Sequence, residues 1–206
     1  MDYLYTILIS YLFGSFNTAY FIGKVHGFDI RERGSHNAGA SNIKVNFGWA
    51  AGIFTGLCDA LKAVAAVKLC GYLFKGNEII PFLAGAVAVI GHMYPFYMGF
   101  KGGKGYASYI GMMAALNIFP VTVAISVITI IVSALTNYIA AGTLAALLIA
   151  PAYYIYTKAN PYVIAIVTGI SLLIAFKHRV NVKRIINHEE IGIFERKKEK
   201  ESESQG

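Results

Sequence analysis

Residues 79–105 read IIPFLAGAVAVIGHMYPFYM followed by GFKGGKG, and this change of composition decides the fold. The first part has no Asp, Glu, Lys or Arg and is long enough to cross, as a helix, a hydrocarbon core of about 30 Å. A lysine at the centre of a membrane helix costs roughly 2.5–3.5 kcal/mol on insertion scales, so residues 99–105 are predicted to form a loop at the membrane edge. Glycine N–H groups and lysine ammonium groups suit the binding of a phosphate there.

The rest of the chain has the composition of a polytopic membrane protein. Of its 206 residues 56% are apolar and 14% charged, and the mean hydropathy is +0.56. The apolar runs are 3–23, 49–74, 79–98, 106–117, 119–136, 138–157 and 161–176. They predict an all-α integral membrane helix bundle with about seven transmembrane segments, the fourth being a half-helix or a tilted, protein-buried segment.

The N-terminal run has the pattern of a retained span. It lacks the basic region of a signal peptide, because Asp2 is the only charge before it. Cys58 and Cys70 lie in an apolar segment and are expected as small buried hydrophobes without a disulfide.

Most basic residues lie in loops that would face one side of the membrane. With seven crossings, loops 24–48, 99–105, 136–137 and 177–206 share one side and carry 14 of the 18 lysine and arginine residues. The positive-inside rule then predicts an external N-terminus, a cytoplasmic C-terminus and a multi-pass protein of the plasma membrane. The net charge of +7 is therefore explained by the basic loops on one side of the membrane, and no nucleic-acid partner is expected.

One domain is predicted over residues 1–194, followed by a polar, disordered tail over 195–206. No internal repeat is visible, so the two-half architecture of many transporters has no support.

Three polar segments could carry chemistry. Residues 29–42 offer serine hydroxyls, asparagine amides and backbone N–H groups for an anion pocket, or form an ordinary loop with capping residues. Loop 99–105 has no Gly-Lys-Ser/Thr triplet, which disfavours nucleotide hydrolysis. In segment 177–190, His178 and Asn181 would share a helix face, whereas its basic residues fit a stop-transfer flank.

Asp59 and Lys62 lie three residues apart near the middle of their predicted span. An internal ion pair that faces the bundle is the favoured interpretation, with a role in shaping the pocket left open. No metal site and no cofactor is predicted.

Four sets of residues recur in one known family. They are Gly34-Ser35-His36-Asn37-Ala38-Gly39-Ala40-Ser41-Asn42; Gly91-His92 with Pro95 and Phe100-Lys101-Gly102-Gly103-Lys104-Gly105; His178, Arg179, Asn181, Arg184 and Glu190; and Asp59 with Lys62. With these motifs the chain resembles, over nearly its whole length, the PlsY family of integral membrane acyl-phosphate:glycerol-3-phosphate acyltransferases.

The resemblance implies transfer of a fatty acyl group from acyl phosphate to the 1-hydroxyl of glycerol-3-phosphate, giving lysophosphatidate for phospholipid synthesis. An acyl phosphate is already activated, so the enzyme needs to hold two anions and place the hydroxyl, with His178 as the candidate base. The implied roles are catalytic for His178, Asn181 and Ser35; substrate-binding for Asn37, Asn42, His92, Lys101, Gly102, Gly103, Lys104, Gly105 and Arg184; and structural for Asp59, Lys62 and Glu190.

Two arginines of the family pattern are replaced, by Val45 beside Lys44 and by Asn137 in the turn 136–138. Losing two cations bears on recognition of the acceptor's phosphate more than on the fold. The alternatives are therefore a diverged member with altered acceptor or lost activity, and a small-anion transporter. The partners implied are the two substrates and membrane lipid, and the oligomeric state stays open.

Overall fold

The computed structural model describes residues 1–116 and 119–194, and within these ranges it contains helices and connecting loops but no strand. The α-helices are α1 (Asp2–Ser15), α2 (Thr18–Val25), α3 (Ala40–Phe47), α4 (Trp49–Leu73), α5 (Ile79–Met93), α6 (Tyr106–Ala115), α7 (Phe119–Thr136), α8 (Ile139–Ala146), α9 (Ile149–Tyr156), α10 (Pro161–Lys177) and α11 (Arg179–Ile186). Two short 3-10 helices are η1 (Ile30–Glu32) and η2 (Phe96–Met98). The predicted tail, residues 195–206, lies outside the described residues.

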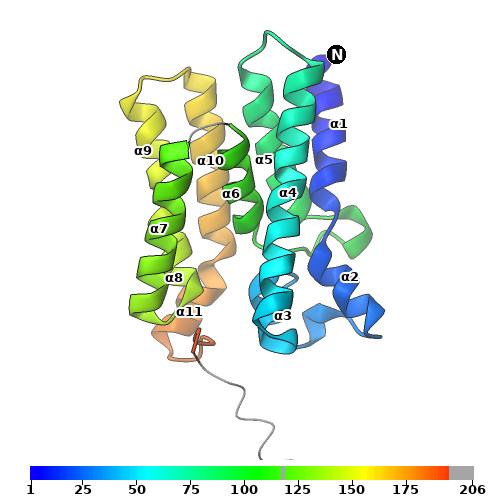
Figure 1. Cartoon of the computed structure of the whole chain (residues 1–206), viewed down its shortest axis with the longest axis vertical. Coiled ribbons are helices and arrows are strands. Elements are labelled where there is room, and N and C mark those ends of the chain that lie inside the picture. The colour runs from blue at the N-terminus through cyan, green and yellow to red at the C-terminus, as the bar shows by residue number, and fades with distance from the viewer. Residues whose placement is uncertain (117–118, 195–206) are drawn as a thin grey trace, which may run out of the picture.

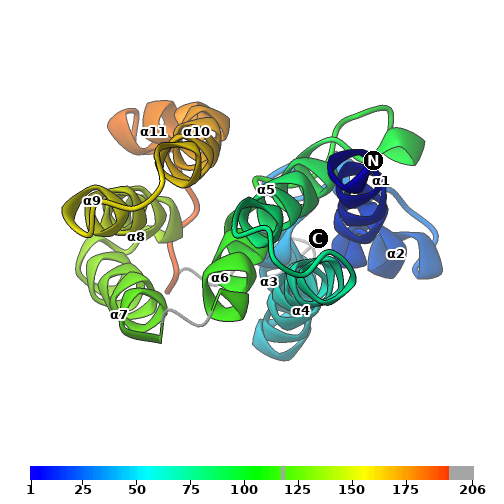
Figure 2. The same ribbon diagram turned by 90° about the horizontal axis from the view of Figure 1, so that it is seen from above.

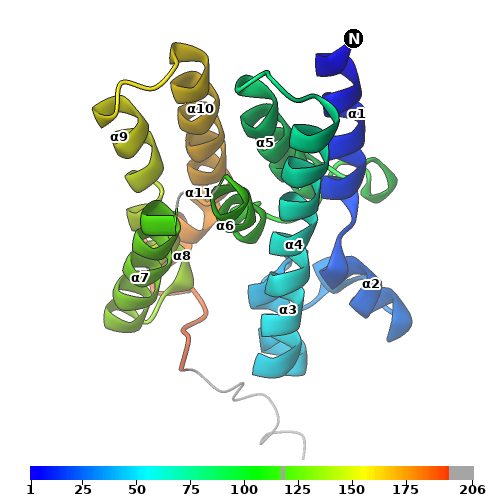
Figure 3. The same cartoon turned by 45° about the horizontal axis from the view of Figure 1, so that its top comes forward.

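The helices form two groups (Figures 1 and 2). Helices α1 to α5 stand on one side and α7 to α11 on the other, and α6 lies between them, as Figure 3 also shows. Helix α6 contacts α4, α5 and α7, and α10 contacts α5, so the two groups are joined along the middle of the molecule.

Packing around α6 explains how so short a helix is held. Tyr109, Met112 and Met113 have no exposed surface, and a Cβ at Gly111 would lie 2.1 Å from the carbonyl oxygen of Ala60 on α4. Only glycine therefore permits this approach of the two backbones. The sequence prediction of a short, protein-buried fourth segment matches this helix.

The all-helical prediction is confirmed, and the apolar helices agree with membrane insertion. In the described ranges four helical stretches are long and apolar enough to span a bilayer: Trp49–Leu73, Ile79–Met98, Phe119–Thr136 and Ile139–Tyr156. The pair Pro161–Lys177 and Arg179–Ile186, bent by 44°, adds a fifth if it counts as one span. Seven crossings and the orientation of the termini stay predictions.

The N-terminal run differs from the single span expected over 3–23. It breaks after Ser15, and Asn17 begins the second helix, because its side-chain oxygen accepts a 2.9 Å hydrogen bond from the N–H of Tyr20. A second hydrogen bond, 3.1 Å from Asn17 Nδ2 to the Ala38 carbonyl oxygen, fixes the break against loop 26–39.

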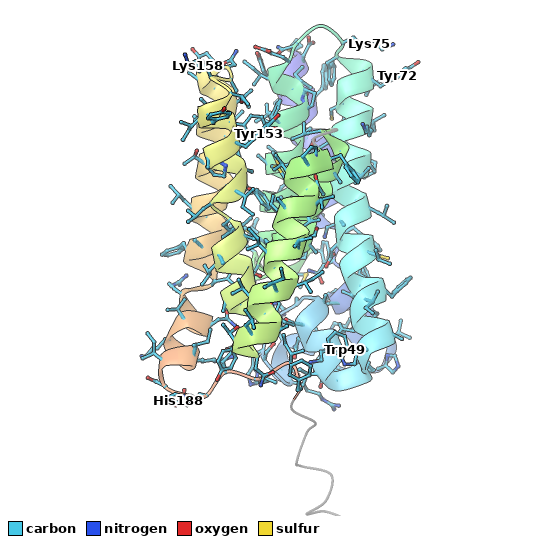
Figure 4. The ribbon with its side chains drawn as sticks, turned by 60° about the vertical axis from the view of Figure 1, so that its left-hand side comes forward. Trp49, Tyr72, Lys75, Tyr153, Lys158 and His188 are labelled. Carbon is cyan, nitrogen blue, oxygen red and sulfur yellow. The ribbon has the colours of Figure 1, made fainter. Side chains whose placement is uncertain are left out.

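Labelled residues identify the two ends of the bundle (Figure 4). Lys75 and Lys158 lie at one end, and Trp49 and His188 lie at the other, which we call the Trp49 end. Loops that were predicted to share one side do meet, since Lys44 Nζ lies 2.6 Å from the carbonyl oxygen of Ile193. Cys58 and Cys70 are free thiols; Cys70 is buried as expected, whereas Cys58 is only partly buried.

Candidate active site

A cavity of about 160 Å³ lies where the predicted polar segments converge. It is lined by Ser35, Asn37, Gly39, Ala40, Ser41, Lys44, Val45, Asp59, His92, Lys104, Gly105, Tyr106, Ala107, Ile139, Ala140, Thr143, His178, Asn181, Glu190, Ile191 and Gly192. Of the predicted site residues, nine border it, whereas Asn42, Lys62, Lys101, Gly102, Gly103 and Arg184 do not.

Two helices begin at this cavity. Gly39 precedes α3 and Gly105 precedes α6, and neither helix has a side chain that caps its first N–H groups. The first residues of both helices, Ala40 with Ser41 and Tyr106 with Ala107, line the cavity. Unpaired N–H groups and the positive end of a helix dipole favour an anion, so the two helix starts are suited to an anion in the cavity.

The first motif supplies a free hydroxyl to this site. The Oγ atom of Ser35 is shielded from solvent and has no hydrogen-bond partner among the described residues. Asn42 holds the loop in place instead of bordering the cavity: its Oδ1 accepts a 2.8 Å bond from the Ser35 N–H, and its Nδ2 donates to the carbonyl oxygens of Ile30 and Arg33. A buried hydroxyl without a partner is costly unless a ligand completes it.

The glycine-lysine loop contributes Lys104. Its Nζ donates to Oδ1 of Asn181, and burial lowers the pKa of Lys104 to about 8, although the nearby Glu190 carboxylate opposes this shift. An ammonium group with a depressed pKa gains from a second anion beside it, so Lys104 is suited to a phosphate. Lys101, by contrast, is exposed and contributes only its carbonyl oxygen, which accepts from Arg31.

The prediction that the glycine N–H groups of loop 99–105 are free to bind a phosphate is wrong for Gly102 and Gly103. The N–H groups of Gly102 and Gly103 donate to the carbonyl oxygens of Met93 and His92, at 3.0 and 3.1 Å. These two groups are therefore occupied and cannot donate to a phosphate. The free N–H groups expected from this loop come instead from the start of α6, after Gly105.

The third motif supplies a histidine with a free ring nitrogen. The chain bends at His178, between α10 and α11, and His178 Nδ1 lies 2.8 Å from the carbonyl oxygen of Ile174. A carbonyl oxygen only accepts, so Nδ1 carries the proton and Nε2 of the neutral ring has a free lone pair. His178 and Asn181 both border the cavity, as their spacing predicted.

Asn181 links the basic loop to an acid. Its Nδ2 donates to Glu190 Oε1 at 2.5 Å, while its Oδ1 accepts a hydrogen bond from Lys104 Nζ. The second oxygen of Glu190, Oε2, is buried without a partner among the described residues. Arg184 ties the same helix to the first motif through a 3.4 Å bond to the Ser35 carbonyl oxygen.

The predicted ion pair between Asp59 and Lys62 is present, with Lys62 Nζ 3.0 Å from Asp59 Oδ1. His92 joins it from α5, with its Nδ1 2.8 Å from Lys62 Nζ. Asp59 and His92 also border the cavity, so the pair is part of the cavity wall.

Beyond Glu190, the C-terminal segment is an element of the site that sequence patterns did not reveal. Ile191 and Gly192 line the cavity next to Glu190, and the segment is held from two sides. Lys44 Nζ donates to the Ile193 carbonyl oxygen at 2.6 Å, and Asn137 accepts from the N–H groups of Ile193 and Phe194, at 2.9 and 3.1 Å. Asn137, which replaces one arginine of the family pattern, and Lys44, which precedes the second replaced position at Val45, therefore anchor this segment. The contact between Lys44 and Ile193 joins residues 149 positions apart, which no local pattern predicts.

Fold and site together define a class: a helical protein with several apolar candidate spans, in which residues of three separated segments line a cavity with a basic side chain, a free hydroxyl and two helix starts. In the described residues no group of three or more His, Cys, Asp or Glu side chains lies together in a way that could hold a metal.

Comparison with known proteins narrows this class. The sequence profile of the family described as glycerol-3-phosphate acyltransferase matches residues 4–188, and the chain belongs to this family. Glycerol-3-phosphate acyltransferase 1 of Oceanobacillus iheyensis is 38% identical over 199 residues, which is 92% of this chain and 94% of that relative. The glycerol-3-phosphate acyltransferase of Clostridioides difficile is 35% identical over 202 residues, covering 95% and 98%.

A solved structure agrees with the family. The crystal structure of PlsY (YgiH), an integral membrane glycerol 3-phosphate acyltransferase, in its glycerol 3-phosphate form superposes with a TM-score of 0.87 and 27% identity, covering 94% of this chain and 96% of that one. The lysophosphatidic acid form of that enzyme gives a TM-score of 0.83 at 26% identity. The resemblance inferred from the motifs is thereby confirmed.

Proposed function

We propose that this protein transfers a fatty acyl group from acyl phosphate to the 1-hydroxyl of glycerol 3-phosphate, releasing phosphate and lysophosphatidate. The observation that carries the proposal is the convergence of two helix starts, Lys104, the free Ser35 hydroxyl and the free Nε2 of His178 on one cavity. Three donors of different kinds and one base in a single cavity suit two phosphates and one hydroxyl.

The reaction needs positioning more than chemical activation. The phosphate of an acyl phosphate is a good leaving group, so the acceptor hydroxyl attacks the carbonyl carbon, its proton passes to His178 Nε2, and the bond to the phosphate oxygen breaks. The starts of α3 and α6 stabilise the departing phosphate and the oxyanion. Because Nδ1 donates to Ile174, the Nε2 lone pair is ready to take the proton without a change of tautomer.

Roles follow for the other cavity residues. Lys104 binds a phosphate, and Asn181 holds the Lys104 ammonium group in place. Ser35 donates its hydroxyl to a substrate oxygen, and Asn37 lines the same wall. Glu190 fixes Asn181 from the far side.

Topology belongs to the same proposal. Residues of the basic loops 24–48 and 99–105 line the cavity, and by the positive-inside rule these loops face the cytoplasm. We infer seven crossings in the plasma membrane, formed by one domain over residues 1–194, with the short helices α1 and α6 completing the set. Soluble glycerol 3-phosphate then enters from the cytoplasm and the acyl chain from lipid.

The test is a donor comparison with purified protein in lipid nanodiscs. Given glycerol 3-phosphate, the protein is expected to form lysophosphatidate with acyl phosphate and to release one phosphate per product. Product from acyl-coenzyme A but not from acyl phosphate would refute the donor while leaving an acyltransferase. Uptake of labelled glycerol 3-phosphate into proteoliposomes without a donor, and no product with either donor, would instead indicate a transporter.

A further inference from the structure

Three buried ionisable side chains next to the cavity have no part in the reaction proposed above. Asp59, Lys62 and His92 are 1%, 7% and 3% exposed and connect α4 to α5. Asp59 and His92 border the cavity, whereas Lys62 lies behind them. Burial of a charged side chain costs free energy unless hydrogen bonds and an opposite charge compensate it, so the partners of these three side chains matter.

The hydrogen bonds of Lys62 assign the proton on His92. An ammonium group has three N–H donors, and Lys62 Nζ has three neighbours: the Phe16 carbonyl oxygen at 2.5 Å, Asp59 Oδ1 at 3.0 Å and His92 Nδ1 at 2.8 Å. The first two can only accept, which leaves the third N–H for His92 Nδ1. Nδ1 therefore accepts, and in the neutral ring the proton sits on Nε2.

The protonated edge of His92 faces away from Lys62. A Cβ on Gly103 would lie 2.1 Å from His92 Nε2, so this nitrogen rests against the backbone of the glycine-lysine loop, where a larger residue would displace it. No hydrogen-bond partner of Nε2 is present among the described residues. A Cβ on Gly103 would also lie 2.7 Å from the Ala38 carbonyl oxygen, so Nε2 faces two loops. Both loops border the cavity, through Lys104 after Gly103 and through Asn37 and Gly39 on either side of Ala38, whereas Nδ1 faces Lys62, which does not border it.

We propose that Lys62, neutralised by Asp59, fixes His92 in the Nε2–H tautomer, so that His92 donates a hydrogen bond to a phosphoryl oxygen of the bound substrate. His178 has the opposite tautomer, since its Nδ1 carries the proton. The cavity thus holds one histidine that donates and one that accepts. Lys62 and Asp59 act through His92 and are positioning residues. The inference rests on the proposed function for the identity of the phosphate.

Nitrogen NMR on protein labelled with ¹⁵N-histidine in nanodiscs tests the tautomer without any substrate. The His92 signals are assigned by their loss in His92→Gln. In the wild type we expect a protonated Nε2 and an unprotonated Nδ1. The Asp59 carboxylate already lies 3.5 Å from Nδ1 in the wild type. In Lys62→Met it becomes the nearest partner of Nδ1, and the proton is expected to move to Nδ1. A wild-type His92 protonated at Nδ1 would overturn the inference, whatever the protein catalyses.

Two substitutions of His92 test whether its Nε2–H donates a hydrogen bond to the substrate. Glutamine places an amide N–H close to the position of Nε2, whereas asparagine reaches only the position of Nδ1 and keeps the acceptor for Lys62. A hydrogen bond to a charged group corresponds to about 10–100-fold in affinity. We therefore expect His92→Asn to raise the KM for a phosphate substrate by this factor and His92→Gln to keep most of the affinity.

The matched control is His188→Asn, because His188 is exposed and its backbone, at φ 58°, is one that asparagine tolerates. Its KM is expected to equal that of the wild type. Equal KM values for the asparagine and glutamine variants of His92, with both proteins folded by their thermal unfolding curves, would refute the donor role. If neither donor nor acceptor supports any reaction in the wild type, the proposed function fails while the tautomer result stands.

Discussion

The depressed pKa of Lys104 is expected to make substrate binding depend on pH in a range where lysine normally does not titrate. With a pKa of about 8, the protonated fraction of Lys104 falls about tenfold between about pH 7 and about pH 9, whereas a lysine of ordinary pKa near 10.4 stays charged. If the ammonium group binds a phosphate, the KM for that substrate rises about tenfold over the same interval.

The sign of the stability effect separates binding from unfolding. The pKa of Lys104 is lower in the folded than in the unfolded chain, so the unfolded chain binds more protons between about pH 8 and about pH 10.4, and this group makes the fold more stable as the pH rises. A loss of affinity at high pH is therefore not explained by unfolding that Lys104 drives.

The assay is the KM for glycerol 3-phosphate and for acyl phosphate across this pH range in the wild type, in Lys104→Arg and in a control. Arginine keeps its charge throughout, so the tenfold rise is expected to disappear in Lys104→Arg. Lys183→Gln is the control, because Lys183 is an exposed lysine on α11 that does not border the cavity. It should keep the wild-type profile. A flat wild-type profile for both substrates would refute the role of Lys104.

Three further predictions concern other parts of the cavity. His178→Ala is expected to lower kcat by about 10²–10⁴-fold with little change in KM, and near-normal turnover would refute the role of His178 as the base. Gly103→Val should impair both kcat and KM, because its Cβ would lie 2.1 Å from His92 Nε2, whereas Gly169→Val, where nothing lies within 4 Å of the added Cβ, should behave as the wild type. Val45→Arg adds a cation to the cavity wall and is expected to lower the KM for glycerol 3-phosphate, so an unchanged KM would show that the missing arginine does not limit binding.

Sequence patterns predicted those parts of the molecule that depend on short-range spacing. The helix-bundle class followed from the apolar runs, and the short fourth segment followed from the length of run 106–117. His178 and Asn181 face one cavity because they lie three residues apart, although the helix bends at His178.

Other features depend on contacts between distant segments. Whether a glycine N–H is free cannot be read from the loop itself, since the Gly102 and Gly103 groups are taken by carbonyl oxygens at the end of α5. The partner of the Asp59–Lys62 pair, His92, lies 30 residues beyond Lys62 and is brought there only by packing of α5 on α4. The break of the first run at Asn17 likewise depends on loop 26–39, through the Ala38 carbonyl oxygen.

The central claim is that this cavity joins acyl phosphate to glycerol 3-phosphate, and a single-turnover measurement tests it most directly. Purified protein is mixed with acyl phosphate and labelled glycerol 3-phosphate, and lysophosphatidate and free phosphate are counted together in the wild type and in a variant that fills the cavity. Ala140→Leu narrows the wall at α8, and Ala145→Leu, at an exposed position of the same helix, is its control. We predict equal amounts of both products in the wild type and the control, and loss of both in Ala140→Leu. Phosphate release without lysophosphatidate, or full activity with the cavity filled, would contradict the account.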